Sequence, residues 1–373
     1  MKNFKKPFAV FAAFALTVSL LAGCGGSESS RHDASATVAD STAQTESSAP
    51  ATQAPNADDP QIKALMDDSV SSYGFKGVAY VTKNGSAVYS SGDINSPYRV
   101  ASVSKQFTSA AVLMLYEEGK LDINSTIDKY FPEYAHGGEI TISQLMNMCS
   151  GIPDYITLAD AGAEYAESAY GISTENTSEQ NREIIKSLIF AQDLLFTPGS
   201  ENYYCNTNYL LLAEIVTQVS GTPYESFITE RMFKPLGMNS TGFGDTWSGE
   251  VTGDDIGDWY KYKGLCYGCA DMISTAADLE KWGEEFIVNK LLSDNIITLM
   301  TTDYLGGYGY GVTPDMGDGF VYHDGNLPPY CSTLSVNRSK GLVLVLLDCD
   351  YSSPLLSMRH DIFTAVTQLE DRY

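Results

Sequence analysis

The chain is poor in positive charge and in histidine. It has 23 lysines and arginines against 47 aspartates and glutamates, which gives a formal net charge of −24 at pH 7. No basic patch stands out, so nucleic acid is not an expected partner, and anionic wall polymers would be repelled at long range. The four histidines are scattered without metal-ligand spacing. We therefore expect no bound metal and no cofactor.

The sequence also lacks the partners that a cysteine-based zinc or redox site needs. Cys266-Tyr267-Gly268-Cys269 has no second cysteine pair at comparable spacing, no nearby histidine and no thioredoxin-like βαβ context. Six of the seven cysteines lie beyond Cys24, an even number that permits disulfides outside the cell. Their pairing cannot be read from the sequence, and we favour buried, reduced thiols.

The first residues have the pattern of a targeting segment. Lysines in Met1–Lys6 precede the apolar stretch Phe8–Ala22, which is too short to be a comfortable membrane span. The stretch ends in Leu21-Ala22-Gly23-Cys24, which resembles a bacterial lipobox. We therefore expect residues 1–23 to be a signal peptide and Cys24 to be lipidated. The alternative is ordinary secretion with a free Cys24.

Residues 24–58 are rich in Ser, Thr, Ala, Asp and Gln and contain almost no large apolar side chains. Such a segment cannot bury enough surface to fold, so we interpret it as a disordered tether that follows the lipid anchor. Residues 59–373 are long enough for one large catalytic unit with two lobes. The predicted location is the outer face of a bacterial cell membrane, with the lipid anchor as the only membrane contact.

Strand patterns occur at both ends of this domain, and helical patterns lie between them. Gly77–Thr82 and Ala87–Ser91 flank an Asn-Gly hairpin signal, and further strands are predicted at Gly319–His323, Ser332–Asn337 and Leu342–Leu347. Helices are predicted over Gln61–Tyr73, Asn206–Val219 and Ser353–Asp371, among others. This order predicts an α+β fold of the α/β-sandwich type. Its antiparallel sheet is built from both chain ends, is flanked by helices, and carries an inserted, mainly helical lobe.

The most informative motif is Ser102-Val103-Ser104-Lys105, the only Ser-x-x-Lys in the chain. It opens a helical pattern over Ser102–Glu118, and residues three apart share one face of a helix. The Ser102 hydroxyl would then lie within reach of the Lys105 amine. Lysine can take the serine proton if burial or a neighbouring positive charge lowers its pKa. Taken alone, the motif also fits an exposed helix face.

Two further motifs are weak when taken singly. Tyr204 and Asn206 are two apart in a loop just before a helix, so both side chains could point the same way, although the same pattern fits a turn with an asparagine N-cap. His323-Asp324-Gly325 follows an apolar strand and, alone, is simply the end of that strand.

Taken together, these motifs resemble the class C β-lactamase and low-molecular-weight penicillin-binding protein superfamily, which implies a β-lactamase/transpeptidase-like fold. The resemblance covers nearly all of residues 60–373. The stretches that carry it are Arg99–Thr108, Ile140–Tyr155, Phe196–Tyr209, Phe233–Met238, Ser274–Leu279 and Tyr308–Gly311.

The resemblance implies a role for each motif residue. Ser102 would be the nucleophile, Lys105 its base or proton relay, and Tyr204 would exchange protons with Ser102 and the leaving group. Asn206 would hydrogen-bond Lys105 and the substrate. The third motif would supply His323, Asp324 and Gly325 to substrate binding. The backbone N–H groups of Ser102 and Asn326 would form the oxyanion hole.

The third motif departs from the family pattern. Histidine replaces the usual β-lactamase lysine at position 323, and Asp324 replaces a small neutral residue. Asp324 would repel a substrate carboxylate if it faces the substrate, whereas it would have no such effect if it points away.

We therefore expect an extracytoplasmic serine hydrolase that acts through a Ser102 acyl-enzyme on a small-molecule ester, a peptide or a cell-wall-related substrate. Esterase, D-aminopeptidase or carboxypeptidase-like specificity is expected first. A true β-lactamase or D-Ala-D-Ala carboxypeptidase is one alternative, and a non-catalytic sensor or binding protein on the same fold is another.

Overall fold

The computed structural model of the chain describes residues 60–158, 170–253 and 256–370. The predicted signal peptide, Cys24 and the whole of the predicted tether lie outside these residues. In the described part of the chain, no helix is long and apolar enough to cross a membrane.

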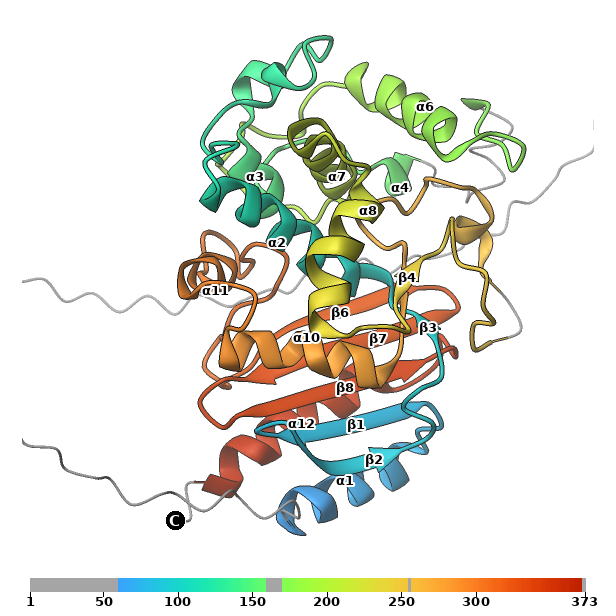
Figure 1. The fold of residues 1–373 in the computed structure, drawn as a ribbon, viewed down its shortest axis with the longest axis vertical. Coiled ribbons are helices and arrows are strands. Elements are labelled where there is room, and N and C mark those ends of the chain that lie inside the picture. Colours follow the sequence, from blue (N-terminus) through green and yellow to red (C-terminus); the bar gives the residue numbers. More distant parts are fainter. Residues whose placement is uncertain (1–59, 159–169, 254–255, 371–373) are drawn as a thin grey trace, which may run out of the picture. The chain divides into compact units, whose positions relative to one another are not determined.

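A five-stranded antiparallel sheet joins the two ends of the domain (Figure 1). The strand order is β2-β1-β8-β7-β6. The strands are β1 (Val78–Lys83), β2 (Ser86–Ser91), β6 (Val321–Leu327), β7 (Tyr330–Asn337) and β8 (Leu342–Asp348). The β1–β2 turn has Asn84 and Gly85 at positive φ, as the Asn-Gly signal predicts. The expectation of a sheet built from both chain ends is confirmed.

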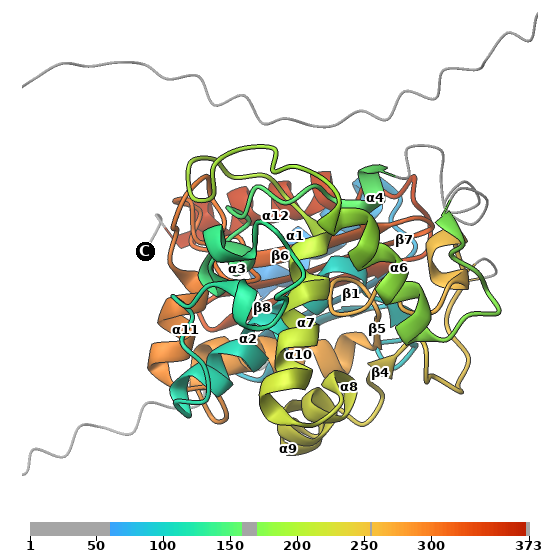
Figure 2. The ribbon, with the colours of Figure 1, turned by 90° about the horizontal axis from the view of Figure 1, so that it is seen from above.

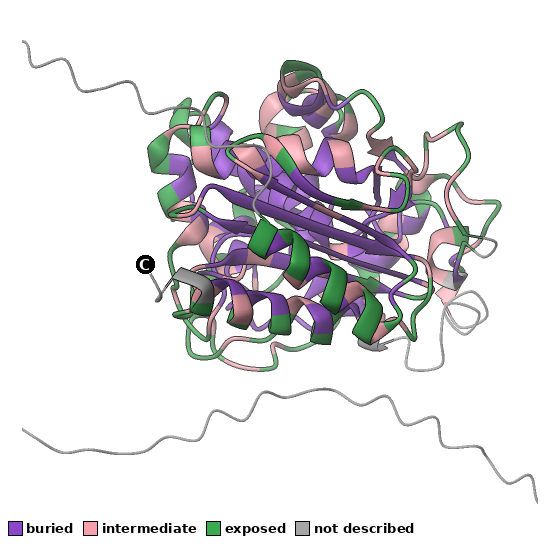
Figure 3. Ribbon diagram, turned by 90° about the horizontal axis from the view of Figure 1, so that it is seen from below, coloured by how far each residue is buried: buried purple, intermediate pink, exposed green. Residues whose placement is uncertain are grey.

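Helices cover both faces of this sheet. Helices α1 (Pro60–Tyr73) and α12 (Leu355–Glu370) pack on one face, with their exposed sides outward (Figure 3). The stacked rings of Phe320 and Phe363 lie in the apolar layer between them and the sheet. Helix α10 (Ala276–Val288) packs on the other face, where Gly283 lies against Val343. Because helices flank both faces, the central strands are buried throughout.

In the sequence, a mainly helical region lies between the first strands of the sheet and the last three. Figure 2 shows this region from above. A short three-stranded sheet, in the order β3-β5-β4, connects it to the large sheet. The remaining elements are β3 (Tyr98–Arg99), η1 (Ala101–Val103), α2 (Ser104–Glu117), η2 (Ile127–Lys129), η3 (Gly137–Glu139), α3 (Ile142–Met146), α4 (Tyr155–Leu158), α6 (Ser178–Phe190), α7 (Asn206–Ser220), α8 (Tyr224–Ile228), η4 (Thr229–Phe233), α9 (Lys234–Leu236), β4 (Gly242–Phe243), η5 (Asp258–Lys261), β5 (Met272–Ser274) and α11 (Asp294–Thr301).

The helix that follows the Ser-x-x-Lys motif begins later than expected. The pattern predicts a helix from Ser102, but Ser102 lies in the 3₁₀ turn η1 and α2 begins at Ser104. The preceding Ala101 has a left-handed φ of 46°, so no right-handed helix can extend back past the turn. From Ser104 to Leu115 every residue of α2 is buried, so the turn sits at the end of a fixed central helix.

Candidate active site

Long-range hydrogen bonds on both sides fix the turn that carries Ser102. The Val100 N–H donates to the Met272 carbonyl at 3.0 Å, and the Ser332 hydroxyl donates to the Val100 carbonyl at 2.7 Å. The following residue, Ala101, is a non-glycine residue at positive φ, a conformation that costs energy and persists only where its surroundings enforce it. Ser102 is therefore held in a defined position between the sheet edge and the helical region.

The Lys105 ammonium group is completely buried and has three acceptors. Its Nζ lies 3.0 Å from the Ser102 Oγ, 2.8 Å from the Asn206 Oδ1 and 2.9 Å from the Cys269 carbonyl oxygen. An ammonium group has three protons to donate, so these acceptors match its full capacity. The expected contact between Ser102 and Lys105 is present, and two further elements fix the lysine.

The charge state of Lys105 differs from the expectation that burial would make it a neutral base. Burial alone acts to lower the pKa of Lys105, but Tyr204, Cys269 and Asp154 outweigh that effect, and the net shift is upward. The three hydrogen-bond acceptors around the Lys105 Nζ fit an ammonium ion in the resting site, and the direction of the pKa shift agrees with that form.

Tyr204 reaches the same point from the loop before α7. The residue as a whole is 41% exposed, yet its hydroxyl has hydrogen-bond contacts with Lys105 and Ser102. The Lys105 Nζ lies 4.9 Å from the ring centroid. Burial of the hydroxyl end raises the pKa of Tyr204 despite the nearby ammonium, so the phenol is neutral at rest.

Asn206 is oriented by a carboxylate that sequence reasoning did not assign. The Asn206 Nδ2 donates to the Asp154 Oδ2 at 2.9 Å, which directs the amide oxygen at Lys105. The Asp154 loop is attached to α7, because Thr207 donates to the Pro153 carbonyl at 2.7 Å. Asp154 falls in the Cys149–Tyr155 turn, and no local signal sets it apart from other turn aspartates.

His323 faces this cluster from the edge strand β6. Its Nε2 lies 2.8 Å from the Tyr308 hydroxyl, and its Nδ1 lies 2.6 Å from the Asp324 carbonyl oxygen. The ring is 6.2 Å from the Tyr204 ring between centroids. Burial, the Lys105 charge and the Arg359 charge lower the pKa of His323 to about 3. Tyr308 lies in a stretch noted in the sequence, but its contact with His323 was not foreseen.

Gly325 permits close contact between β6 and the Ser102 turn. A Cβ at this position would lie 2.2 Å from the Val100 carbonyl oxygen and 2.2 Å from the Ser332 Oγ. No side chain fits that space, so the glycine is required by the approach of the two backbones.

The structure does not place Asp324 among these residues. Successive residues of a strand point to opposite faces, so Asp324 points away from the His323 face and toward α12. There its Oδ2 pairs with the Arg359 guanidinium at 3.1 Å. The idea that Asp324 faces a substrate carboxylate is therefore wrong, and the considered alternative, that it points away, agrees with the structure.

The side chain of Asn326 is exposed and also lies on the Asp324 face of β6. The predicted role of Asn326 uses its backbone N–H rather than its side chain. β6 is an edge strand, and such a strand has backbone groups that no neighbouring strand pairs on its free side.

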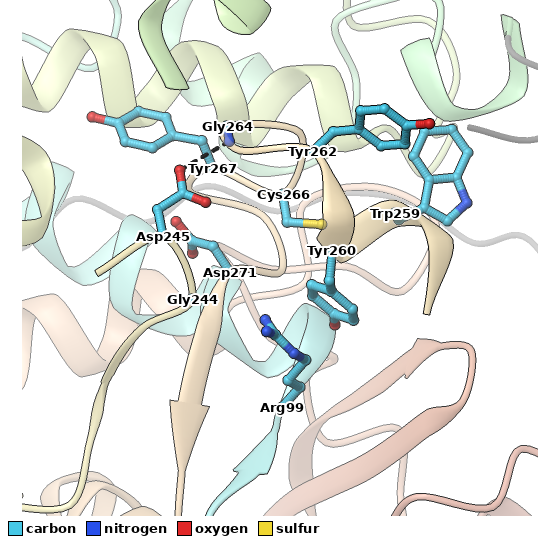
Figure 4. Close-up of a pocket in the computed structure, with 10 residues that line it drawn as sticks. All are labelled: Arg99, Gly244, Asp245, Trp259, Tyr260, Tyr262, Gly264, Cys266, Tyr267 and Asp271. Atoms are coloured by element: carbon cyan, nitrogen blue, oxygen red, sulfur yellow. Dashed lines mark hydrogen bonds between the residues drawn. The ribbon is translucent and has the colours of Figure 1, made fainter. Parts of the chain in front are cut away.

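The loop that presents the Cys269 carbonyl to Lys105 also borders a separate pocket (Figure 4). In it the Arg99 guanidinium lies 4.3 Å from the Tyr260 ring centroid. The Asp271 Oδ2 accepts the Gly268 N–H at 3.1 Å, and burial raises the pKa of this carboxyl well above its usual value. None of the residues that line this pocket belongs to the Ser102 cluster. The lining residues are Arg99, Gly244, Asp245, Trp259, Tyr260, Tyr262, Gly264, Cys266, Tyr267 and Asp271.

Five cysteines of the described residues are free thiols and are buried: Cys149, Cys205, Cys266, Cys269 and Cys331. Burial raises the pKa of Cys269 to about 11, and the pKa of Cys266 is also raised. Neither thiol is therefore activated as a nucleophile. In the same described residues, no group of three or more His, Cys, Asp or Glu side chains could hold a metal ion.

The chain is similar in sequence to two bacterial proteins, PbpX and flp. PbpX of Bacillus subtilis, whose name describes it as a candidate penicillin-binding protein, is 29% identical over 318 residues, which cover 77% of this chain and 75% of PbpX. Protein flp of Staphylococcus aureus is 27% identical over 311 residues, and the match covers 74% of this chain but only 59% of flp.

Solved structures show the same fold. A D-stereospecific amidohydrolase from Streptomyces superposes with a TM-score of 0.69 at 24% identity, covering 80% of this chain and 98% of that one. A penicillin-binding protein from Bacillus halodurans superposes with a TM-score of 0.66 at 20% identity, covering 82% and 99%. At these identities the likeness concerns the fold alone.

The family match extends over most of the domain. The Beta-lactamase family matches residues 62–348, from α1 to the end of β8, and so spans every element that contributes to the Ser102 cluster. With this match, the mixed fold and the cluster geometry in agreement, the chain belongs to the beta-lactamase family of serine hydrolases.

Proposed function

We propose that the chain hydrolyses an ester or amide bond through an acyl-enzyme on Ser102. The observation that carries the proposal is the position of the Lys105 Nζ, which is 3.0 Å from the Ser102 Oγ and is fixed by Asn206 and the Cys269 carbonyl. A serine hydroxyl becomes a nucleophile when adjacent groups can accept its proton and compensate the charge that develops.

In the proposed mechanism the Ser102 Oγ attacks the substrate carbonyl carbon. The Tyr204 hydroxyl and Lys105 form one proton-transfer unit: Tyr204 accepts the serine proton as it passes its own proton toward the leaving amine or alcohol, so the unit returns to its resting state. Backbone N–H groups of Ser102 and Asn326 stabilise the oxyanion. Water then attacks the Ser102 ester and gives a proton to the same unit, which returns a proton to the Ser102 oxygen as the acid is released.

Amides and esters of small acyl groups are the substrates we propose. D-amino acid amidase of Ochrobactrum anthropi superposes with a TM-score of 0.66, and the Streptomyces neighbour is named as D-stereospecific. These names belong to those proteins, but they identify D-amino acid amides as the first compounds to try. β-Lactam hydrolysis and D-Ala-D-Ala carboxypeptidase activity are the competing specificities.

We propose further that the enzyme acts outside the cytoplasm, anchored by a lipid on Cys24. The support is the sequence alone: a basic start, an apolar stretch and Leu21-Ala22-Gly23-Cys24. The tether would hold the domain away from the membrane surface.

A fluorophosphonate probe tests the nucleophile directly. The wild-type domain should be labelled covalently, and Ser102→Ala should lose the label with little change in melting temperature. Ser90→Ala is a matched control, because Ser90 is exposed on β2, away from the cluster. Full labelling of Ser102→Ala would show that another residue is the nucleophile, and an unlabelled wild type that turns over no substrate would support a non-catalytic binding protein.

A substrate panel then separates the specificities. It contains p-nitrophenyl esters, D-amino-acid anilides, nitrocefin and D-Ala-D-Ala peptides. The proposal expects the esters or anilides to have the highest kcat/KM. Faster hydrolysis of nitrocefin would identify a β-lactamase instead.

A further inference from the structure

The hydrogen bonds of His323 define which ring nitrogen carries the proton. Nδ1 lies 2.6 Å from the Asp324 carbonyl oxygen, and a carbonyl can only accept, so Nδ1 carries the hydrogen. In a neutral ring Nε2 is then an acceptor, and the Tyr308 hydroxyl at 2.8 Å donates to it. Both nitrogens are therefore occupied by the protein, and neither has an N–H left to offer a ligand.

The surroundings of His323 oppose a positive charge on the ring. Lys105 from α2 and Arg359 from α12 both act against the imidazolium, and Arg359 is already paired with the Asp324 carboxylate. The other side chains that face the His323 ring are the neutral phenols of Tyr204 and Tyr308. Within the described residues, the hydrogen bonds and charge interactions of His323 involve no carboxylate side chain.

We propose that Tyr308 is a specificity-determining residue, which keeps the third-motif His323 neutral with both ring nitrogens engaged by the protein, so that the site selects substrates without a carboxylate beside the scissile bond. This inference rests on the proposed function of Ser102. A substrate carboxylate beside the scissile bond needs a cation or a free hydrogen-bond donor in the protein. Without either, removing that carboxylate from water is unfavourable. Esters, amides and anilides with an uncharged leaving group avoid that cost.

The role of Tyr308 is one of positioning, since its hydroxyl contacts His323 rather than the bond to be broken. Tyr308 and His323 meet edge to face, with ring centroids 5.8 Å apart. Tyr308→Phe keeps that packing and removes only the donor to Nε2. The ring nitrogen can then take a proton from solution at a higher pH than in the wild type, and the resulting imidazolium can pair with a carboxylate.

The first test is spectroscopic and does not depend on turnover. The chain has only four histidines, so ¹⁵N-labelled histidine spectra can be assigned with single substitutions. His323 should show the neutral form with the proton on Nδ1 throughout pH 5–8. In Tyr308→Phe its titration should move upward by about 2.5 pH units from the wild-type pKa of about 3, which brings the midpoint near pH 5.5 and within the measured range. An imidazolium signal for wild-type His323 at pH 6, or an unchanged titration in the variant, would overturn the proposal.

The second test measures selectivity with 3-acetoxybenzoate and its methyl ester, which differ by one carboxylate charge. Tyr308→Phe should raise kcat/KM for the acid relative to the ester by about 10-fold at pH 5.5, mainly through KM, as expected for a hydrogen bond to a charged group. The gain should vanish in Tyr308→Phe/His323→Gln. Tyr310→Phe is the matched control, because Tyr310 stacks on Tyr304 in the same segment.

The outcomes separate this inference from the function on which it rests. If Tyr308→Phe is labelled by the fluorophosphonate but its ratio of kcat/KM for the acid to kcat/KM for the ester stays at the wild-type value, Tyr308 does not set selectivity. If wild type itself is neither labelled nor active, the proposed function fails, while the histidine spectra still decide the state of His323.

Discussion

Gly325→Ala tests whether close contact between β6 and the Ser102 turn is required. The added Cβ would lie 2.2 Å from the Val100 carbonyl oxygen, whereas ordinary contact begins near 3.4 Å, so the backbones must separate by about 1 Å. The Ser332 hydroxyl lies at the same short distance and already donates to that carbonyl. Overpacking of this kind costs about 1–3 kcal/mol of folding free energy.

The functional loss should exceed the loss of stability. Val100 is two residues before Ser102, and a displacement of about 1 Å at a reacting group can reduce a rate by about 100-fold. Gly325→Ala should therefore remain folded at 25 °C by circular dichroism, with a lowered melting temperature. Its rate of fluorophosphonate labelling should be about 100-fold below that of the wild type.

Gly138→Ala is the matched control. A Cβ at Gly138 would have its nearest neighbour, the Asp128 Oδ2, at 3.8 Å, and the φ angle there is not positive. This variant should label at the wild-type rate and melt within about 2 °C of it. If Gly325→Ala behaves like Gly138→Ala, the close approach of β6 does not position the nucleophile and the steric reasoning is refuted.

Three further predictions concern charge and location. Lys105→Ala and Tyr204→Phe should each lower kcat by about 100-fold or more, and the double variant should lose little beyond that, because groups that act as one unit are not additive; multiplied losses would indicate independent roles. His323 is neutral in the folded chain down to a pKa of about 3, whereas an unfolded histidine binds a proton near pH 6.5, so its contribution to stability falls as pH drops below 6.5. Between pH 7.5 and 5, urea unfolding should show a loss about 2 kcal/mol larger in wild type than in His323→Gln; equal losses would place the titration elsewhere. Cys24→Ser should move the full chain out of the membrane fraction or leave the leader uncleaved, and unchanged membrane association would refute lipidation.

The elements that could be predicted are those with local signals. Asn84-Gly85 specifies the β1–β2 turn through positive φ angles, and Gly221 ends α7 in a left-handed conformation, as expected after an apolar helical stretch. The 3₁₀ turn at Ser102 could not be predicted. It follows the left-handed Ala101, which is enforced by hydrogen bonds of Val100 with strands far away in sequence.

The site divides in the same way. The contact of Ser102 with Lys105 was predicted from helix spacing, and the contact of Asn206 with Lys105 was expected from the family resemblance. Asp154 was not assigned, because its bond to Asn206 spans 52 positions and leaves no periodic trace. The orientation of the Asp324 side chain could not be predicted either, because it depends on whether position 324 lies within strand β6 or just after its end.

The protonation states of the cluster constrain how the reaction can begin. Lys105 is an ammonium ion with its three protons directed at acceptors, and Tyr204 is a neutral phenol, so no strong base faces Ser102 at rest. A substrate carbonyl that approaches Ser102 changes this balance, because charge developing on its oxygen is compensated by the buried ammonium at short range. Proton movement through Tyr204 then becomes favourable only as the tetrahedral intermediate forms. A neutral His323 adds no second cation, and Lys105 is thus the single positive charge among the cluster residues described here. The proposed selectivity for uncharged substrates and the proposed proton path therefore have one origin: a site with one fixed positive charge that is already engaged in the chemistry.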